Sequence, residues 1–526
     1  MSLSPSARQS FFVFSGTLAS RILGFVRVIL IGTTLGYTRL SDSYSLANET
    51  PNMMYELILG SLIASTMVPF FVQQYKRKDR DADHALMSFV FISAIGLTGL
   101  TLLLTPVLAQ IMTALNSSST AQAQENLVIF FLLFLLPQIF FYAMTAAMQA
   151  FLAARSRFVA AAFAPIINNV VVIATLLYIR TRQEELDVPL DQIKSSSLMT
   201  TLAIGTTLGV VLVSVVVGIV YIRAGGRLSY VSINNKHVRA LISRSKWMVA
   251  YSLVNQIALF AIIAFANTYS GGVVMYLVAW SFFQLPHGLF ANSIMTTMIP
   301  RITHTLDQSE VDVNKIRLTP ETGTITRQTA TGLTIVMSFI SALGIAIAVP
   351  VMNLLIGHGS ISASQAEHTG RVLIGFLVFL PAFSLYLFNV RLSNSLNKTK
   401  TIFFINVLQN TCNVLFALLF RDSFTVVGLS VAFSLSYLVV IPLSIRVMSK
   451  ELEASLLFKK TTTVMVMTCS IAALGGFFVS TRIDNIYAAI PAGLAVCILI
   501  QAAGSLFARD ELMGLARLAY RRKNFS

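Results

Sequence analysis

The sequence predicts an all-α polytopic membrane protein with about fourteen transmembrane helices, and three observations support this fold class. First, the 526 residues are 55% hydrophobic and only 11% charged, with a mean hydropathy of +0.75. Soluble domains average about 25% charged residues, so a soluble enzyme of this size is excluded. Second, apolar runs of about 20 residues, the length that crosses a bilayer, recur along the chain. Third, the lysines and arginines concentrate in alternate connections between these runs.

The predicted spans follow one another with short connections. The first span, 10–35, is preceded by a single charged side chain, that of Arg8. The span is too long for the apolar region of a signal peptide, so we expect a retained first helix. The second, 43–73, has acidic residues in its first half. The other twelve are expected at 85–114, 126–153, 158–179, 198–222, 247–268, 271–300, 328–355, 372–390, 401–420, 424–445, 461–480 and 485–508.

Basic residues orient these spans. With the amino terminus in the cytoplasm, the inner segments carry 29 lysines and arginines and the outer loops carry 7, while Arg21 and Arg27 lie inside the first span. Positive charge on cytoplasmic loops is the signal that sets membrane orientation. We therefore expect both chain ends in the cytoplasm. The net charge of +16 is then a topology signal, supported by anionic lipid heads, and does not indicate nucleic-acid binding.

Two similarities within the sequence predict an internal repeat. Residues 64–71 resemble residues 295–302 six spans later, and residues 169–177 of span five resemble residues 413–419 of span eleven. Because six is even, both copies have the same orientation, as in transporters with parallel repeats. We expect two six-helix lobes around a central cavity, followed by two additional helices. The expected divisions are 1–224 for the first lobe, 225–450 for the second, and 451–526 for spans 13 and 14 with a basic cytoplasmic tail.

Charged residues inside the predicted spans are confined to the first two helices. A charge at the bilayer centre costs about 2.5–3.5 kcal/mol on insertion scales, so such residues are functional candidates. Arg21 and Arg27 lie in the first span, and Glu49 and Glu56 lie in the second, with Asp42 at its outer mouth. The three acidic residues are seven positions apart, which predicts one helical stripe if the helix continues through a proline at position 51.

The two arginines allow two interpretations. Arginine binds phosphate oxygens in a bidentate manner, so at least one side chain could face an anionic substrate. Alternatively, Arg21 and Arg27 pair with the acidic residues of span two and only join two helices. Ser20 shares a helical face with Arg27, whereas Arg21 points about 120° away unless Gly24 bends the helix.

The sequence shows no motif for catalysis or for a resident cofactor. It contains no GxxxxGK[ST] phosphate loop, no HExxH and no GxSxG, so we expect a protein that is not an enzyme and that has no metal site. Three cysteines lie in apolar runs without metal-binding spacing, and we interpret them as buried apolar residues. His287, beside a proline, is interpreted as a hydrogen-bonded packing residue, with a proton carrier as the alternative.

Several motifs resemble one transporter family. They are Ser20-Arg-Ile-Leu-Gly-Phe-Val-Arg27, then Asp42, Pro51-Asn52, Met67-Val-Pro69, and Arg157-Phe158 through Phe163-Ala-Pro165 to Asn169. Together with the span count and the repeat, they resemble the MurJ (MviN) lipid II flippases of the multidrug/oligosaccharidyl-lipid/polysaccharide (MOP) exporter superfamily. The resemblance covers nearly the whole chain, and its most specific part is the motif in the first span.

The resemblance implies a function and a set of roles. The family moves an undecaprenyl-pyrophosphate-linked disaccharide pentapeptide from the inner to the outer leaflet by alternating access, which is commonly attributed to membrane potential or ion gradients. In that family, the counterparts of Arg21 and Arg27 line the central cavity and meet the pyrophosphate. The counterpart of Gly24 lets the first helix bend, and that of Asp42 lies near the outer gate. Spans 13 and 14 form a groove that admits the lipid tail.

This sequence departs from the family at four places. The family typically has an arginine where Tyr55 stands, an Asp-Arg pair where Trp280 and Ser281 stand, a glutamate where Gln284 stands, and an aspartate where Val28 stands. The run from Gln284 to Gly288 is similar to an actinobacterial branch, so we interpret these changes as variation between lineages. The candidate substrate-binding residues are Ser20, Arg21, Gly24, Arg27, Asp42, Glu49, Tyr55, Glu56, Ser281 and Gln284.

Other functions remain open at this point. A flippase for another polyprenyl-linked glycan or a cation-coupled drug exporter would belong to the same superfamily. A membrane scaffold that binds cell-wall synthases would be a different class of protein. The expected partners are lipid II and membrane lipids, with cell-wall synthases as a further candidate class, and no nucleic acid.

Overall fold

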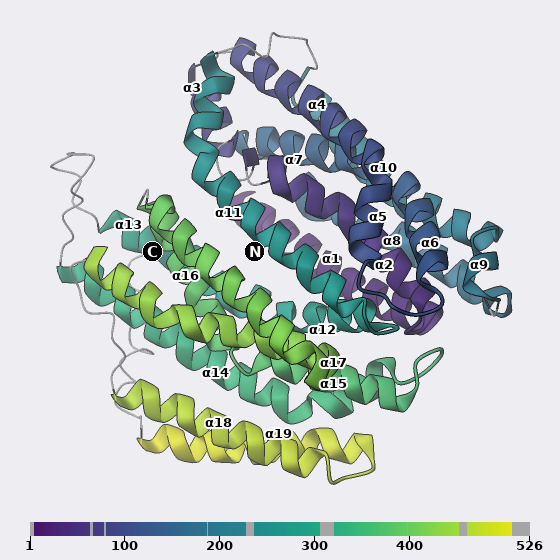
Figure 1. Cartoon of the computed structure of the whole chain (residues 1–526). Helices are drawn as coiled ribbons and strands as arrows, with labels where there is room; N and C mark the ends of the chain where they lie inside the picture. The colour runs from purple at the N-terminus through teal and green to yellow at the C-terminus, as the bar shows by residue number, and fades with distance from the viewer. Residues whose placement is uncertain are drawn as a thin grey trace. The chain divides into compact units, whose positions relative to one another are not determined.

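The computed structural model describes residues 5–60, 62–63, 67–77, 80–186, 188–227, 236–305, 320–396, 398–451 and 460–507. All regular elements in these ranges are helices, which confirms the predicted all-α class (Figure 1). A helix pairs every backbone N–H and C=O within one segment, which is what a chain in hydrocarbon requires. The helices form two compact units, Met1–Val274 and Met275–Ser526.

Unit 1 contains the helices up to α11. Their bounds are α1 Pro5–Leu35, α2 Arg39–Tyr55, the π-helix η1 Glu56–Gly60, α3 Val68–Arg77, α4 Arg80–Leu103, α5 Thr105–Thr113, α6 Ala121–Leu135, α7 Gln138–Ala154, α8 Val159–Arg180, the 3-10 helix η3 Gln183–Leu186, α9 Leu190–Ile193, α10 Ser197–Arg223 and α11 Lys236–Ala266. In this unit α1 packs along α8, α8 packs along α10, and α2 packs against α6 and α7. Its core includes the fully buried rings of Tyr44, Phe71, Phe131 and Phe151.

Unit 2 is built around one long helix, α14. Its helices are most of α12 (Gly272–Pro286), the π-helix η4 His287–Ala291, α13 Asn292–His304, α14 Pro320–Ile356, α15 Ala363–Leu377, α16 Leu380–Ser395, α17 Thr399–Glu451, α18 Lys460–Ser480 and α19 Ile486–Phe507. Helices α15, α16, α18 and α19 all pack against α14. In Figure 1, α18 and α19 run side by side along it.

The number of spans differs from the expected count. Eleven helices in the described ranges are long and apolar enough to cross a membrane, and the bent pair α15 and α16 gives a twelfth. The expected span 43–73 is instead divided into α2, η1 and α3. The count of about fourteen therefore stays a prediction.

The expected spans 401–420 and 424–445 lie in a single continuous element, α17. This element has 53 residues, and at 1.5 Å per residue it would be about 80 Å long, more than twice the hydrocarbon thickness. Thr425 has non-helical backbone angles, φ 53° and ψ −140°, so two helices meet there. The element is therefore long enough for two crossings with a turn at Thr425.

The expected lobes are not the two compact units. Helix α11, which we expected to begin the second lobe after residue 224, packs within unit 1 against η1, α4 and α5. The parallel repeat of six spans stays a prediction. Part of its first motif, at residues 64–66, and the basic tail after residue 508 lie outside the described residues.

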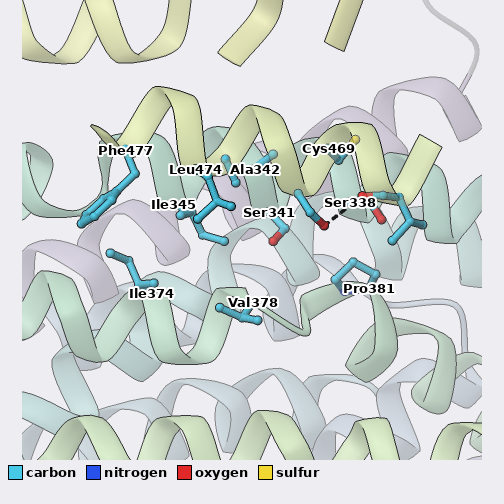
Figure 2. Close-up of a pocket in the computed structure, with 13 residues that line it drawn as sticks. Ser338, Ser341, Ala342, Ile345, Ile374, Val378, Pro381, Cys469, Leu474 and Phe477 are labelled. Atoms are coloured by element: carbon cyan, nitrogen blue, oxygen red, sulfur yellow. Dashed lines mark hydrogen bonds between the residues drawn. The ribbon is translucent and has the colours of Figure 1, made fainter. Parts of the chain in front are cut away.

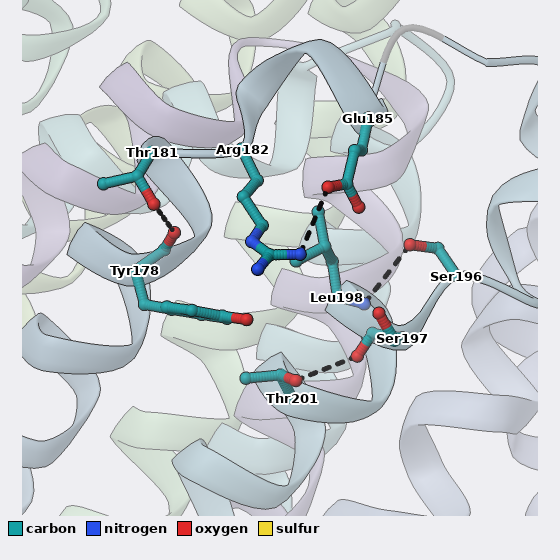
Figure 3. A network of polar contacts seen from close by, with 8 residues as sticks. All are labelled: Tyr178, Thr181, Arg182, Glu185, Ser196, Ser197, Leu198 and Thr201. Atoms are coloured by element: carbon teal, nitrogen blue, oxygen red, sulfur yellow. Dashed lines mark hydrogen bonds and ion pairs between the residues drawn. The ribbon is translucent and has the colours of Figure 1, made fainter.

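Polar side chains fix the ends of several helices. Thr38 caps α2, where its backbone N–H donates to Ser41 Oγ at 3.0 Å. Between α8 and α10, Arg182 pairs with Glu185 at 3.4 Å and lies over the ring of Tyr178 (Figure 3). In the same connection Gln183 Nε2 donates to the carbonyl of Thr34 at 3.1 Å, which satisfies a carbonyl in the last turn of α1.

Candidate functional site

Helix α1 carries the two candidate arginines and is positioned by α8. A side-chain carbon built on Gly16 would lie 2.7 Å from the ring of Phe163, so only glycine allows this approach. At Gly24 the neighbour is Asn169, whose Nδ2 donates to the backbone oxygen of Ser20 at 3.0 Å. In an α-helix that oxygen also accepts the N–H of the residue four positions later, which is Gly24. Asn169 therefore fixes the part of α1 just before Arg27.

Arg21 and Arg27 are both partly buried. In the described part of the chain, neither forms an ion pair or a hydrogen bond with another side chain, and Nε of Arg27 is buried without a partner. Pairing with Glu49 and Glu56 to join two helices is therefore not what the structure shows. A buried N–H without a partner is costly and is usually satisfied by a ligand or by water.

The surroundings of Arg27 within unit 1 are polar. Its positive charge acts on Glu49, Tyr44 and Tyr142. The two tyrosine hydroxyls are engaged elsewhere: that of Tyr44 with Thr206 at 2.9 Å, and that of Tyr142 with Gln138 at 3.1 Å. Glu49 is thus an acidic side chain within electrostatic range of Arg27 that forms no ion pair with it.

Asp42 is fully buried and binds the beginning of α12. Its Oδ2 accepts the N–H of Gly271 at 2.6 Å, and its Oδ1 accepts those of Val273 and Val274 at 3.0 and 3.3 Å. A carboxylate at a helix N-terminus satisfies backbone donors that have no partner within the helix and interacts favourably with the helix dipole. One turn earlier in α2, Arg39 donates to the carbonyls of residues 267 and 268. The amino-terminal turn of α2 therefore holds the connection between α11 and α12.

Tyr55 and Glu56 lie where α2 changes into η1. Tyr55 is buried, and its ring centroid lies 6.2 Å from that of Tyr142. The carboxylate of Glu56 lies over Gly60, and its backbone oxygen accepts the hydroxyl of Ser252 at 2.8 Å. The three acidic residues of the expected stripe therefore lie in different surroundings. Asp42 binds the start of α12, Glu49 lies near Arg27, and Glu56 lies in η1.

The candidates of unit 2 lie on α12. Ser281 donates to the carbonyl of Leu277 within its own helix at 2.9 Å, and Gln284 is partly buried. Trp280 packs in an aromatic cluster, with ring centroids 5.2 Å from Phe433 and 5.3 Å from Phe283. The side chain of Trp280 is therefore part of an apolar core in unit 2.

His287 has the surroundings of a packing residue. Its Nδ1 lies 3.0 Å from the hydroxyl of Ser384, and its ring centroid lies 4.7 Å from that of Phe383. Among the described residues, no group of three or more His, Cys, Asp or Glu side chains could hold a metal ion. The three cysteines are free, and two of them are buried.

A pocket of about 340 Å³ lies in unit 2 between α14, the α15–α16 pair and α18 (Figure 2). This pocket is not among the features that the sequence predicts. The expected groove belonged to spans 13 and 14, whereas the lining of this pocket comes from α18 and from two elements that precede it. The only signal in the sequence is Pro381, because a proline inside an apolar run indicates a break that separates neighbouring helices.

The comparison with known families decides what kind of protein carries this site. The model of the family described as "Lipid II flippase MurJ" matches residues 31–492. The chain belongs to the MurJ family. This match confirms the family that the motifs of the first span resemble.

Relatives in the MurJ family are distant in sequence. A probable lipid II flippase MurJ from Rickettsia prowazekii is 22% identical over 427 residues, which are 80% of this chain and 79% of the relative. A probable lipid II flippase MurJ from Haemophilus influenzae is 23% identical over 441 residues, which are 80% of this chain and 82% of the relative. The similarity therefore extends over most of each protein.

Solved structures confirm the fold. A structure described as lipid II flippase MurJ in an inward closed conformation matches with a TM-score of 0.75 at 19% identity, covering 95% of this chain and 100% of that chain. An inward-facing multidrug resistance MATE transporter of the MOP superfamily matches with a TM-score of 0.63 at 13% identity, covering 83% and 96%. This MurJ family member thus has the fold of MOP transporters and is a multi-pass membrane protein.

Proposed function

We propose that this protein moves lipid II, a polyprenyl-pyrophosphate-linked peptidoglycan precursor, from the inner to the outer leaflet by alternating access. Membership of the MurJ family supports the substrate class. The observation in the structure that carries the proposal is Arg27, a partly buried cation on an apolar helix whose Nε has no partner among the described residues. Such a cation is stabilised by an anionic ligand, and pyrophosphate offers bidentate oxygen acceptors.

Each candidate residue has a proposed role. Arg27 binds the pyrophosphate, and Arg21 approaches it when α1 bends at Gly24. Glu49 balances the charge of Arg27 while no substrate is bound. Because Tyr55 and Ser281 replace arginines that the family typically has, recognition depends more strongly on the two arginines of α1. Ser20, Gln284 and the acidic residues Asp42 and Glu56 shape the path rather than bind the phosphates.

The proposal also includes the membrane arrangement. Both chain ends lie in the cytoplasm, because the basic residues then concentrate on the inner side of the plasma membrane. Membrane potential or an ion gradient drives the cycle, and no nucleotide is needed. Cell-wall synthases are a partner class that this function favours, because they consume the substrate.

The first prediction concerns Arg27. In proteoliposomes that contain labelled lipid II, we expect Arg27→Ala to slow translocation by about 10- to 100-fold, because hydrogen bonds to charged groups contribute about 1.5–3 kcal/mol. Arg27→Lys should retain part of the rate, since a lysine keeps the charge but loses the bidentate geometry. The readout is the fraction of label that becomes accessible to a membrane-impermeant quencher.

The matched control is Arg182→Ala. This arginine forms an exposed ion pair with Glu185, and such pairs contribute little to stability. Unchanged translocation in Arg27→Ala, in protein that still unfolds at the wild-type temperature, would contradict the pyrophosphate role of Arg27.

The same assay separates the alternative functions of the superfamily. Translocation of another polyprenyl-linked glycan instead of lipid II would favour a flippase for that glycan. Efflux of organic cations would favour a drug exporter, although a basic α1 repels such substrates.

A non-transporting scaffold predicts a different pattern. In cells depleted of the protein, a variant with both arginines of α1 replaced by alanine would then restore growth. The transport proposal predicts that this variant fails to restore growth while it accumulates to normal levels in the membrane. Lipid II that stays equally accessible on the outer leaflet after depletion would argue against transport altogether.

A further inference from the structure

Side-chain amides attach helix α1 to α8 at its middle and at its carboxy-terminal end. Nδ2 of Asn169, on α8, donates to the carbonyl of Ser20 at 3.0 Å. Nε2 of Gln183, which follows α8, donates to the carbonyl of Thr34 at 3.1 Å. Earlier in α1 the contact with α8 is apolar, because Gly16 packs against an aromatic ring of that helix. The first half of α1 therefore has its polar attachment at Ser20.

The carbonyl of Ser20 has a second donor in addition to the backbone. In an α-helix it accepts the N–H of Gly24, four residues later. The amide of Asn169 donates to the same oxygen, which has two lone pairs for two such bonds. A helix carbonyl that has only its backbone partner becomes unsatisfied when that bond opens. The carbonyl of Ser20 keeps a partner, so opening the bond between Ser20 and Gly24 costs less than opening such a turn.

The other half of the amide lies beside the group that the opening would release. A side-chain carbon built on Gly24 would lie 3.5 Å from Nδ2 and 3.9 Å from Oδ1 of Asn169, so both polar atoms lie against this glycine. When the backbone bond opens, the N–H of Gly24 is released where Oδ1 can accept it. Asn169 is only 6% exposed, so water does not compete for these bonds. One amide can thus replace both halves of the backbone bond, as a bend in hydrocarbon requires.

Helix α1 has both a reason and the space to bend at this glycine. Arg21 and Arg27 lie about 120° apart around a straight helix, so they point to different sides. Glycine permits backbone conformations that other residues resist, and helices kink where a side chain inserts into their hydrogen bonds. Leu18 and Ile22 are 38% and 55% exposed, so one face of α1 is not packed against protein. A bend at Gly24 would change the angle between the segments that carry the two arginines.

We propose that Asn169 is the pivot on which α1 bends, because its side-chain amide replaces the backbone hydrogen bond between Ser20 and Gly24. The bend brings Arg21 and Arg27 toward one pyrophosphate group. The inference rests on the proposed function for the identity of this ligand. Asn169 is a positioning residue, since it acts through α1 and does not touch the substrate. Without its amide, two backbone groups lose their partners in apolar surroundings, and α1 stays straight.

The test measures the bend in the full chain, reconstituted in nanodiscs of dioleoylphosphatidylglycerol. Spin labels are placed on Leu18→Cys in the first half of α1 and on Leu177→Cys of α8, both at exposed positions. Cys412, the partly exposed native cysteine, is replaced by alanine in every variant. Pulsed electron paramagnetic resonance measures the distance between the labels with undecaprenyl pyrophosphate as the probe and undecaprenol as the control without phosphates. Labels on Leu177→Cys and Val215→Cys, on α8 and α10, give a reference distance that does not involve α1.

The expected result is a bent population that depends on the amide. In the unsubstituted chain, undecaprenyl pyrophosphate should add a second population of distances on α1, whereas undecaprenol should not. Asn169→Leu keeps the shape but loses donor and acceptor, so this population should fall about tenfold, in the range for a buried carbonyl without a partner. Asn169→Gln keeps an amide and should restore part of it. The matched control is Asn168→Leu, because Asn168 faces Gly209 of α10, and it should behave like the unsubstituted chain.

A purely structural role of Asn169 predicts a different result. Asn169→Leu would then lower the unfolding temperature, while the change in label distance caused by undecaprenyl pyrophosphate would persist. That result overturns the proposal, as do distances in the unsubstituted chain that do not respond to the probe.

A second variant keeps the test decisive if Asn169→Leu does not fold. The added carbon of Gly24→Ala lies at an ordinary contact distance from the amide, so this variant should fold. Alanine favours a straight helix over glycine, and the bent population should therefore fall about fivefold. An unchanged bent population in Gly24→Ala would overturn the location of the bend.

Failure of this inference is distinguishable from failure of the proposed function. If the unsubstituted chain translocates lipid II, and Asn169→Leu does so at the same rate and with the same change in label distance, the pivot is wrong and the transport function stands. If the unsubstituted chain bends with undecaprenyl pyrophosphate, and Asn169→Leu does not, but no lipid II is translocated, the proposed function fails and the pivot stands.

Discussion

At the scale of single residues, the sequence indicated which positions are unusual but not what each one contacts. Arg21 and Arg27 stood out because charges are rare in apolar spans, and the structure places both on α1 without ion-pair partners among the described residues. Asp42 stood out for the same reason, yet its partners at residues 271, 273 and 274 lie more than 220 positions away in the chain. Contacts between residues so far apart depend on the packing of whole helices.

The prediction at this scale concerns Asp42. Replacing it by asparagine removes the charge and brings an amide donor toward the N–H groups that begin α12. We expect Asp42→Asn to lower the free energy of unfolding by about 2 kcal/mol, in the range for hydrogen bonds to charged groups. Thermal unfolding of the purified protein in detergent would measure the loss. Asp191→Asn, at an exposed position of α9, is the matched control and should unfold like the wild type.

At the scale of elements, most apolar runs became helices, and the exceptions have local causes. The expected second span is interrupted because α2 changes into the π-helix η1 at Glu56. The tenth is bent at Pro381, and the long element α17 changes direction at Thr425. Proline was readable from the sequence, because its missing N–H has a fixed consequence. The π-helix η1 was not readable from the sequence, because it depends on how α2 packs against its neighbours.

The prediction at this scale concerns the packing of α14, α18 and α19. A side-chain carbon built on Gly476 would lie 2.6 Å from Cβ of Ala346 and 2.8 Å from the carbonyl of Gly493. Gly476→Ala should therefore push α18 away and lower the free energy of unfolding by about 1–3 kcal/mol. Gly99→Ala is the matched control, because no atom lies within 4 Å of its added carbon. Equal thermal stability of the two variants would contradict this packing.

At the scale of the whole molecule, family and fold class were accessible from the sequence, whereas the division into units was not. The all-α membrane fold and the MurJ family are confirmed. The expected boundary at 224 falls before α11, which packs with unit 1, and the compact units meet at residue 274. Hydropathy locates helices but contains no information on which helix packs against which.

The prediction at this scale is the orientation of the chain. A cysteine at Ser195, between α9 and α10, should react with a membrane-impermeant maleimide added to intact cells. A cysteine at Arg157, between α7 and α8, should react only after the membrane is permeabilised. The native cysteines Cys469 and Cys497 are buried and should label slowly, so Cys412→Ala is a sufficient background. The reverse pattern would place the chain ends outside the cytoplasm.

The sequence by itself determined the features that depend on composition and local order. These are the apolar spans, the asymmetry of basic residues, the rare charges on α1 and the motifs that mark the MurJ family. Only the tertiary structure decided that Asp42 holds the start of α12, that Asn169 binds α1 beside Gly24, and that a pocket lies at the broken span. The physical reason is the uniformity of an apolar helix surface. Many faces can pack in hydrocarbon, and the choice depends on small residues and a few polar contacts between distant parts of the chain.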